Sequence, residues 1–145
     1  RVNYWTGKEG VLFEKEFSNY VGNKYSVAVS NGSVALEIAL KALKLNKKDH
    51  IIASPRSFII SASCLINCGF KPVFADVDNN GNLSLEGIKK VYTKKVKAIV
   101  LVHLNGMPCD LDPIRTALKH TVLYTKIDQW ALLATFLLGH SVKIK

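Results

Sequence analysis

The stretch Tyr25-Ser-Val-Ala-Val-Ser-Asn-Gly-Ser-Val-Ala-Leu36 joins two different hydrophobic periods. Its first part, Tyr25–Val29, has the composition of a β-strand, whereas the apolar residues from Ala35 onward recur at the spacing of an amphipathic helix. The small polar residues between them, Ser30 to Ser33, are typical of a tight turn. The stretch therefore predicts a strand that turns directly into a helix over residues 33–44, which is the repeating unit of an α/β fold.

The turn between these two elements has the layout of an anion-binding site. The first N–H groups of a helix lack partners within the helix, and the helix dipole is positive there, so a phosphate is stabilised at that end. Gly32 lets the backbone approach a ligand closely, and Ser33 supplies a hydroxyl. The same residues also suit an ordinary turn with a Ser or Asn helix cap, and the turn by itself favours that simpler interpretation.

Strand-like and helix-like segments alternate along most of the chain. Strands are expected at residues 25–29, 51–53, 72–75, 98–102 and 122–127, and helices at 9–20, 33–44, 58–68, 84–92 and 110–119, with Ser84 and Asp110 as caps. This alternation predicts a three-layer α/β fold, with a mostly parallel sheet between helices and no internal domain boundary. Ligands of such sheets bind beyond the carboxyl ends of the strands, so the loops 30–33, 54–58 and 103–106 and Asp128 are expected to converge.

Composition narrows the function classes. A chain of 145 residues with 48% hydrophobic content is sized for one core. No run of about 18 apolar residues and no secretory signal is evident, so we expect a cytoplasmic protein without a membrane partner.

The net charge of +9 is spread over scattered lysines without an Arg-rich helix or zinc-finger motif, which favours a solvated surface over nucleic-acid binding. The cysteines Cys64, Cys68 and Cys109 are expected to be small buried residues, with no disulfide framework and no metal site.

Six segments, in this order along the chain, resemble the DegT-type (DegT/DnrJ/StrS) sugar aminotransferases. They are Asn3-Tyr-Trp-Thr-Gly7, Phe13-Glu-x-Glu-Phe-x-x-Tyr-x-Gly22, Ser30-Asn-Gly-Ser-Val-Ala-Leu36, Ser54-Pro-Arg-Ser-Phe58, Gly69-Phe-Lys-Pro-Val-Phe-Ala-Asp-Val-Asp78 and Val102-His-Leu-Asn-Gly-Met-Pro-Cys-Asp-Leu-Asp-Pro-Ile114. The resemblance implies a fold-type I enzyme that uses pyridoxal 5'-phosphate (PLP) to aminate a keto sugar linked to a nucleotide. It also implies a role in surface polysaccharide, lipopolysaccharide or amino-sugar biosynthesis, an amino donor such as glutamate, and a homodimer.

The resemblance assigns cofactor-binding roles to four residues. Gly32 and Ser33 match the Gly-Thr step that holds the PLP phosphate, and Phe58 matches the aromatic residue that stacks on the pyridine ring. Asp128 matches the carboxylate that keeps the pyridine nitrogen protonated, with Ile127 in place of the family's Glu. Matching from Gly139-His-Ser-Val142 instead puts Ile127 in the aspartate position, so the register there is open by one residue. The alternatives are core packing for Phe58 and a surface carboxylate for Asp128. We assign no role to His103, which matches a family histidine.

The resemblance places the Schiff-base lysine of the family beyond residue 145, in a Ser-x-x-Lys segment that precedes a C-terminal small domain. Residues 1–145 are thus expected to be the N-terminal part of the PLP-binding large domain, with no catalytic residue of their own. Two interpretations stay open: part of an active aminotransferase, or a truncated or degenerate non-catalytic remnant of that family. A nicotinamide-dependent enzyme is disfavoured because no Gly-x-Gly-x-x-Gly follows residues 25–29.

Overall fold

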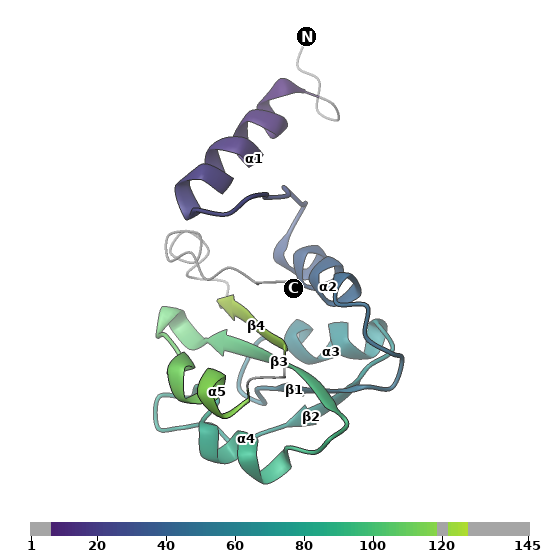
Figure 1. Ribbon diagram of the computed structural model, residues 1–145, viewed down its shortest axis with the longest axis vertical. Coiled ribbons are helices and arrows are strands. Elements are labelled where there is room, and N and C mark those ends of the chain that lie inside the picture. Colours follow the sequence, from purple (N-terminus) through teal and green to yellow (C-terminus); the bar gives the residue numbers. More distant parts are fainter. Residues whose placement is uncertain (1–6, 119–121, 128–145) are drawn as a thin grey trace.

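The computed structural model describes residues 7–118 and 122–127, and these residues are built around one parallel β-sheet (Figure 1). Its strands are β1 (His50–Ala53), β2 (Lys71–Phe74), β3 (Val96–His103) and β4 (Val122–Ile127). The strand order is β2-β1-β3-β4, and every neighbouring pair is parallel. The helices are α1 (Lys8–Val21), α2 (Gly32–Ala42), α3 (Ile60–Asn67), α4 (Leu85–Val91) and α5 (Leu111–Ala117).

The two faces of the sheet bury different apolar clusters because successive residues of a strand point to opposite sides. On one face, Ile52 and Ile99 pack in a cluster with residues of α4 and α5. On the other face, Ile51 and Val100 pack in a cluster with residues of α2 and α3. Helices therefore cover both faces, as Figure 1 shows, and the predicted three-layer α/β fold is confirmed.

Strand β3 has a nearly continuous apolar sequence because helices cover both faces of the sheet. Its residues from Ala98 to His103 are all buried, and the strand has a neighbour on each side. A strand that is covered on both faces shows no polar alternation, which is the pattern of parallel sheets. The expected strand at residues 98–102 is confirmed, and it extends by two residues towards the N-terminus and one towards the C-terminus.

Side chains cap the starts of α2 and α4, and a glycine follows the end of α1. The Asn31 side chain accepts a hydrogen bond from the Val34 N–H, and the Ser84 side chain accepts one from the Gly87 N–H. Helix α1 ends at Gly22, whose φ of 70° lies in the left-handed region that glycine adopts readily. Asp110 occupies the cap position of α5, as expected, but its side chain makes no cap hydrogen bond.

The prediction of a strand at residues 25–29 is wrong. This segment is extended but belongs to no strand, and it follows α1 instead of joining the sheet. The Ser26 hydroxyl donates to the Glu14 carbonyl oxygen, and the Ala28 N–H donates to the Glu14 carboxylate at 2.8 Å. Tyr25 and Val27 remain 75% and 74% exposed. A strand needs a neighbouring strand to pair its backbone groups, and none of the described residues supplies one here.

Candidate functional site

The carboxyl edge of the sheet brings together two of the loops that the sequence placed there. Because β1 and β3 are parallel, the loop that starts at Ser54 and the turn that starts at His103 leave the sheet at the same edge. The turn after β3 forms a short 3-10 helix, η1 (Leu104–Gly106). The loop 30–33 does not follow a strand, which corrects that part of the expectation. Asp128 lies outside the described residues.

The start of α2 presents free backbone donors. The Asn31 side chain and carbonyl accept hydrogen bonds from Val34 and Ala35, at 3.0 and 3.1 Å. Among the described residues, no acceptor lies within reach of the Gly32 and Ser33 N–H groups, which are the first of the helix. A Cβ atom added at Gly32 would meet nothing within 4 Å, so the space beside its Cα is open. Open space, two free donors and the positive helix end together suit an anion.

The loop after β1 is fixed by its own serines and presents an aromatic side chain. The buried Ser54 hydroxyl exchanges hydrogen bonds with the Arg56 backbone at 3.2 Å, and the Ser57 and Ser61 hydroxyls are 2.8 Å apart. Phe58, in the same loop, is 44% exposed. Exposure to this degree distinguishes Phe58 from a fully packed core residue.

His103, which sequence reasoning left without a role, is buried and held in one orientation at the end of β3. Its Nδ1 accepts the Cys109 N–H at 2.9 Å, so Nδ1 carries no proton and the neutral ring is protonated at Nε2. The Cys109 thiol in turn donates to the Val102 carbonyl oxygen at 3.0 Å. Burial raises the pKa of the Cys109 thiol to about 11, with a further contribution from Asp78, while a backbone hydrogen bond from Leu83 opposes the shift.

Asn82 ties this edge to the loop after β2, and sequence reasoning did not single it out. Its side chain is buried, donates to the Met107 carbonyl oxygen at 3.0 Å and accepts from the Leu104 N–H at 3.0 Å. Its own N–H donates to the Asp78 carboxylate at 3.0 Å. The sequence showed only a cluster of turn residues here, because the two loops that Asn82 joins are far apart along the chain.

The cysteines follow the expectation in part. Cys64 and Cys109 are buried, whereas Cys68 is half-buried. Burial raises the pKa of the Cys68 thiol; Lys41 lowers this pKa and Glu37 raises it further.

Within residues 7–118 and 122–127, no group of three or more His, Cys, Asp or Glu side chains has the arrangement of a metal site. No helix in the same part of the chain is both long and apolar enough to cross a membrane.

Comparison with known proteins places the chain in a family. Residues 2–129 match the DegT/DnrJ/EryC1/StrS aminotransferase family. The chain is 33% identical over 142 residues to the GDP-perosamine synthase of Vibrio cholerae, covering 95% of this chain and 39% of that protein. It is 40% identical over 118 residues to the spore coat polysaccharide biosynthesis protein SpsC of Bacillus subtilis, covering 80% of this chain and 30% of that protein. The chain belongs to the DegT/DnrJ/EryC1/StrS aminotransferase family, and it spans about a third of the length of these relatives.

Solved structures show the same fold. The aminotransferase from Psychrobacter cryohalolentis superimposes with a TM-score of 0.78 at 46% identity, covering 86% of this chain and 32% of that one. A GDP-4-keto-6-deoxymannose-3-dehydratase, solved with a trapped PLP-glutamate geminal diamine, also gives 0.78 at 31% identity, covering 82% of this chain and 33% of that one. The α/β fold of the described residues is thus that of part of a PLP-dependent enzyme.

Proposed function

We propose that this chain is the N-terminal part of the PLP-binding large domain of an aminotransferase that acts on nucleotide-linked keto sugars. The family match and the relatives named as GDP-perosamine synthases support this function. The observation that carries the proposal is the start of α2, where the Gly32 and Ser33 amides, which make no hydrogen bond within the described residues, and the Ser33 hydroxyl lie at the positive end of an eleven-residue helix.

The described residues fit the phosphate end of PLP. The Gly32 and Ser33 amides would donate to phosphate oxygens, and the absence of a Cβ at Gly32 leaves room for the group. Ser33 is half-buried, so its hydroxyl is partly shielded from water and adds a third donor. A phosphate held in this way needs no cationic side chain, because the helix end supplies the compensating charge.

Phe58 and Asp128 would bind the ring of the cofactor. The resemblance gives Phe58 the role of stacking on the pyridine ring, where its side chain would exclude water from one side of the cofactor. The Asp128 carboxylate would pair with the pyridine nitrogen and hold it protonated. PLP, when bound, supplies the electron sink that makes proton removal next to a substrate nitrogen possible. The chain's own residues would bind and orient the cofactor, and the Schiff-base lysine would come from a later segment of the full-length protein.

The proposed partners follow from the relatives. A nucleotide-linked keto sugar is the proposed acceptor and glutamate the proposed amino donor, which the PLP-glutamate adduct in the dehydratase structure supports. We further propose a cytoplasmic homodimer with a role in surface polysaccharide or lipopolysaccharide biosynthesis. The relative SpsC, named for spore coat polysaccharide biosynthesis, supports a polysaccharide role.

A second candidate function is PLP-dependent dehydration of a nucleotide-linked keto sugar. Structures of a GDP-4-keto-6-deoxymannose-3-dehydratase match this chain at 31% identity with TM-scores of 0.78 and 0.79. Both reactions need the same phosphate, ring and nitrogen contacts. They differ in the product, which is an amino sugar after amination and a deoxy keto sugar after dehydration. A non-catalytic remnant of the family would give neither.

The test measures PLP binding and product formation by the full-length protein that contains this chain. Gly32→Ala places a methyl group in open space, so we expect normal folding and at least tenfold weaker PLP binding, because the methyl occupies the ligand's position. Gly10→Ala is the matched control, since a Cβ there also meets nothing within 4 Å but lies on α1, away from the site. Unchanged PLP affinity in Gly32→Ala would contradict the proposed phosphate site.

Product analysis then separates the functions. Formation of an amino sugar from a GDP-linked 4-keto sugar and glutamate supports the aminotransferase. A deoxy keto sugar with release of ammonia supports the dehydratase instead. PLP binding without either product on a panel of nucleotide-linked keto sugars supports the remnant.

A further inference from the structure

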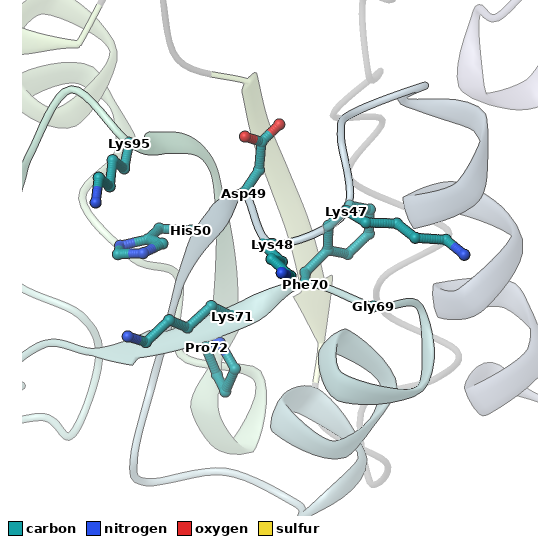
Figure 2. Close-up of a pocket in the computed structure, with 9 residues that line it drawn as sticks. All are labelled: Lys47, Lys48, Asp49, His50, Gly69, Phe70, Lys71, Pro72 and Lys95. Carbon is teal, nitrogen blue, oxygen red and sulfur yellow. The ribbon is translucent and has the colours of Figure 1, made fainter.

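A second recess lies at the opposite edge of the sheet from the candidate cofactor residues. It is an open pocket of about 620 Å³, formed where β1 and β2 begin and where the chain enters β3 (Figure 2). Four lysines line it: Lys47, Lys48, Lys71 and Lys95. The strands run in parallel from this amino edge to the carboxyl edge, so the length of the sheet separates the pocket from Phe58 and His103.

The positive charge of this pocket is only partly compensated by the described part of the chain. Asp49 is its single carboxylate, and one oxygen of Asp49 accepts the Asn46 N–H at 2.9 Å. The ion pairs within residues 7–118 and 122–127 use Lys41 and Lys90, so none of the four pocket lysines has a carboxylate within 4.0 Å there. Several ammonium groups around one recess repel one another and create a positive potential that an anion relieves.

The backbone holds the segments that bear these lysines in a fixed arrangement. The Lys48 N–H donates to the Gly69 carbonyl oxygen at 2.8 Å, and the Lys71 N–H donates to the Asp49 carbonyl oxygen at 2.9 Å. The His50 N–H donates to the Lys95 carbonyl oxygen at 3.0 Å. Three segments far apart in the sequence are therefore joined at the pocket, so its shape is set by the sheet rather than by flexible loops.

We propose that this pocket binds a small polyphosphate anion, such as inorganic pyrophosphate or the diphosphate group of a nucleotide. Its volume lies in the range of small-molecule sites, and lysine ammonium groups bind phosphate as compact point charges. In Figure 2 the ends of Lys71 and Lys95 lie on the same side as the His50 imidazole, whereas Lys47 points the other way. Lys71 and Lys95 are therefore the principal ligands, with His50 between them as a further donor.

The concave shape decides against an extended polyanion. Nucleic-acid binding depends on many phosphate contacts along a basic stripe or groove, whereas these lysines surround one recess. We expect a ligand with two adjacent phosphates to engage both principal lysines, one phosphate with each ammonium group. A single phosphate reaches fewer ammonium groups, so we expect orthophosphate to bind more weakly than pyrophosphate.

The test is calorimetric titration of pyrophosphate, ADP and orthophosphate into the full-length protein, saturated with PLP so that the site at α2 is filled. We expect pyrophosphate to bind at one site, with at least tenfold lower affinity in the Lys71→Gln/Lys95→Gln variant. Lys15→Gln/Lys89→Gln is the matched control, because it removes the same charge from exposed positions outside the pocket and is expected to change the affinity less than twofold. The affinity should also fall as salt is raised.

Four outcomes overturn the proposal. They are no pyrophosphate binding, equal weakening in both double variants, unchanged binding in Lys71→Gln/Lys95→Gln, and tight binding of a single-stranded oligonucleotide that pyrophosphate does not displace. Binding of ADP with the same dependence on Lys71 and Lys95 identifies a nucleotide diphosphate as ligand, whereas binding of pyrophosphate alone identifies the free anion. Normal PLP affinity in the pocket variant shows that loss of pyrophosphate binding is not a loss of fold.

Discussion

The N-terminal unit, α1 with the extended segment up to residue 29, and the sheet unit, residues 50–103, bury their apolar side chains very differently. In the sheet unit, Ile51, Ile52 and Ile99 are fully buried between helices. In the N-terminal unit, Phe13 is 54% exposed and the one buried residue of α1 is Ser18. An amphipathic sequence is therefore not sufficient to bury a helix, because burial requires a second apolar surface at the right place.

The largest difference between the two units is expected for truncation of an apolar side chain. Ile99→Ala leaves a cavity between two covered faces of β3 and should lower the free energy of unfolding by about 4 kcal/mol. Urea unfolding followed by circular dichroism measures the change. A loss below about 1 kcal/mol would mean that the centre of the sheet is not close-packed, and the comparison would then fail.

The next effect concerns the link between two loops of the carboxyl edge. Asn82→Ala removes one donor and one acceptor and leaves the Leu104 N–H and the Met107 carbonyl without this partner, so we expect a loss of about 3 kcal/mol. Asn80→Ala is the control, because Asn80 is exposed and contributes its backbone N–H to the same turn. Equal urea midpoints for the two variants would show that the buried amide adds nothing to this edge.

Cys109, which bonds to the end of β3 in the sheet unit, makes the stability of the fold depend on alkaline pH. The folded protein holds the thiol protonated up to a pKa of about 11, against an ordinary value of 9.0, so it binds more protons than the unfolded chain between these values. The stabilisation is complete below pH 9 and is lost as the pH rises through 11, by about 3 kcal/mol in total. Cys109→Ala should lose less stability over this interval when both proteins are unfolded in urea at pH 8.5, 9.5 and 10.5. If the free energy of unfolding fell equally with pH in both proteins, the raised pKa of Cys109 would be contradicted.

Helix caps give a smaller effect with an internal control. Ser84→Ala removes the acceptor of the Gly87 N–H and should cost about 1 kcal/mol of unfolding free energy. Asp110→Ala occupies the equivalent position of α5, where the side chain makes no cap hydrogen bond, and should cost less than half as much. If the two variants unfold at the same urea concentration, cap position rather than the hydrogen bond controls these helices.

The smallest effect is expected in the N-terminal unit. Phe13→Ala removes a side chain that is half exposed and packs on Phe17 within the same helix, with ring centroids 5.8 Å apart. We expect a change of about 0.5 kcal/mol in the unfolding of these 145 residues. Repeating the measurement in the full-length protein sharpens the comparison. A much larger loss there would show that another part of that protein covers this helix.

Sequence reasoning succeeded where local signals and tertiary packing agree. The continuous apolar run of β3 and the serine before α4 each predicted the observed element, because strand burial and the cap hydrogen bond are properties of neighbouring residues. The segment Tyr25–Val29 has an equally good strand composition but lies outside the sheet, because strand formation requires a partner that the described residues do not provide.

The candidate site shows the same division. Gly32 and Ser33 were predicted to start a helix because a helix start is a local feature, and the structure places them in the first turn of α2, with open space beside the Gly32 Cα. Asn82 and the orientation of His103 were not found, because their hydrogen bonds join residues that only the fold brings together. The lysines of the amino-edge pocket were taken for a scattered solvated surface, since they are dispersed over three segments of the chain.

The amino-acid sequence by itself determined the α/β class, the family, most helix and strand positions and the start of α2, because hydrophobic periodicity, capping residues and turn chemistry act over a few residues. Only the tertiary structure decided which strands pair, which loops share an edge and which charges surround one recess. These features depend on the direction and order of parallel strands, and strand order is not encoded in any single segment.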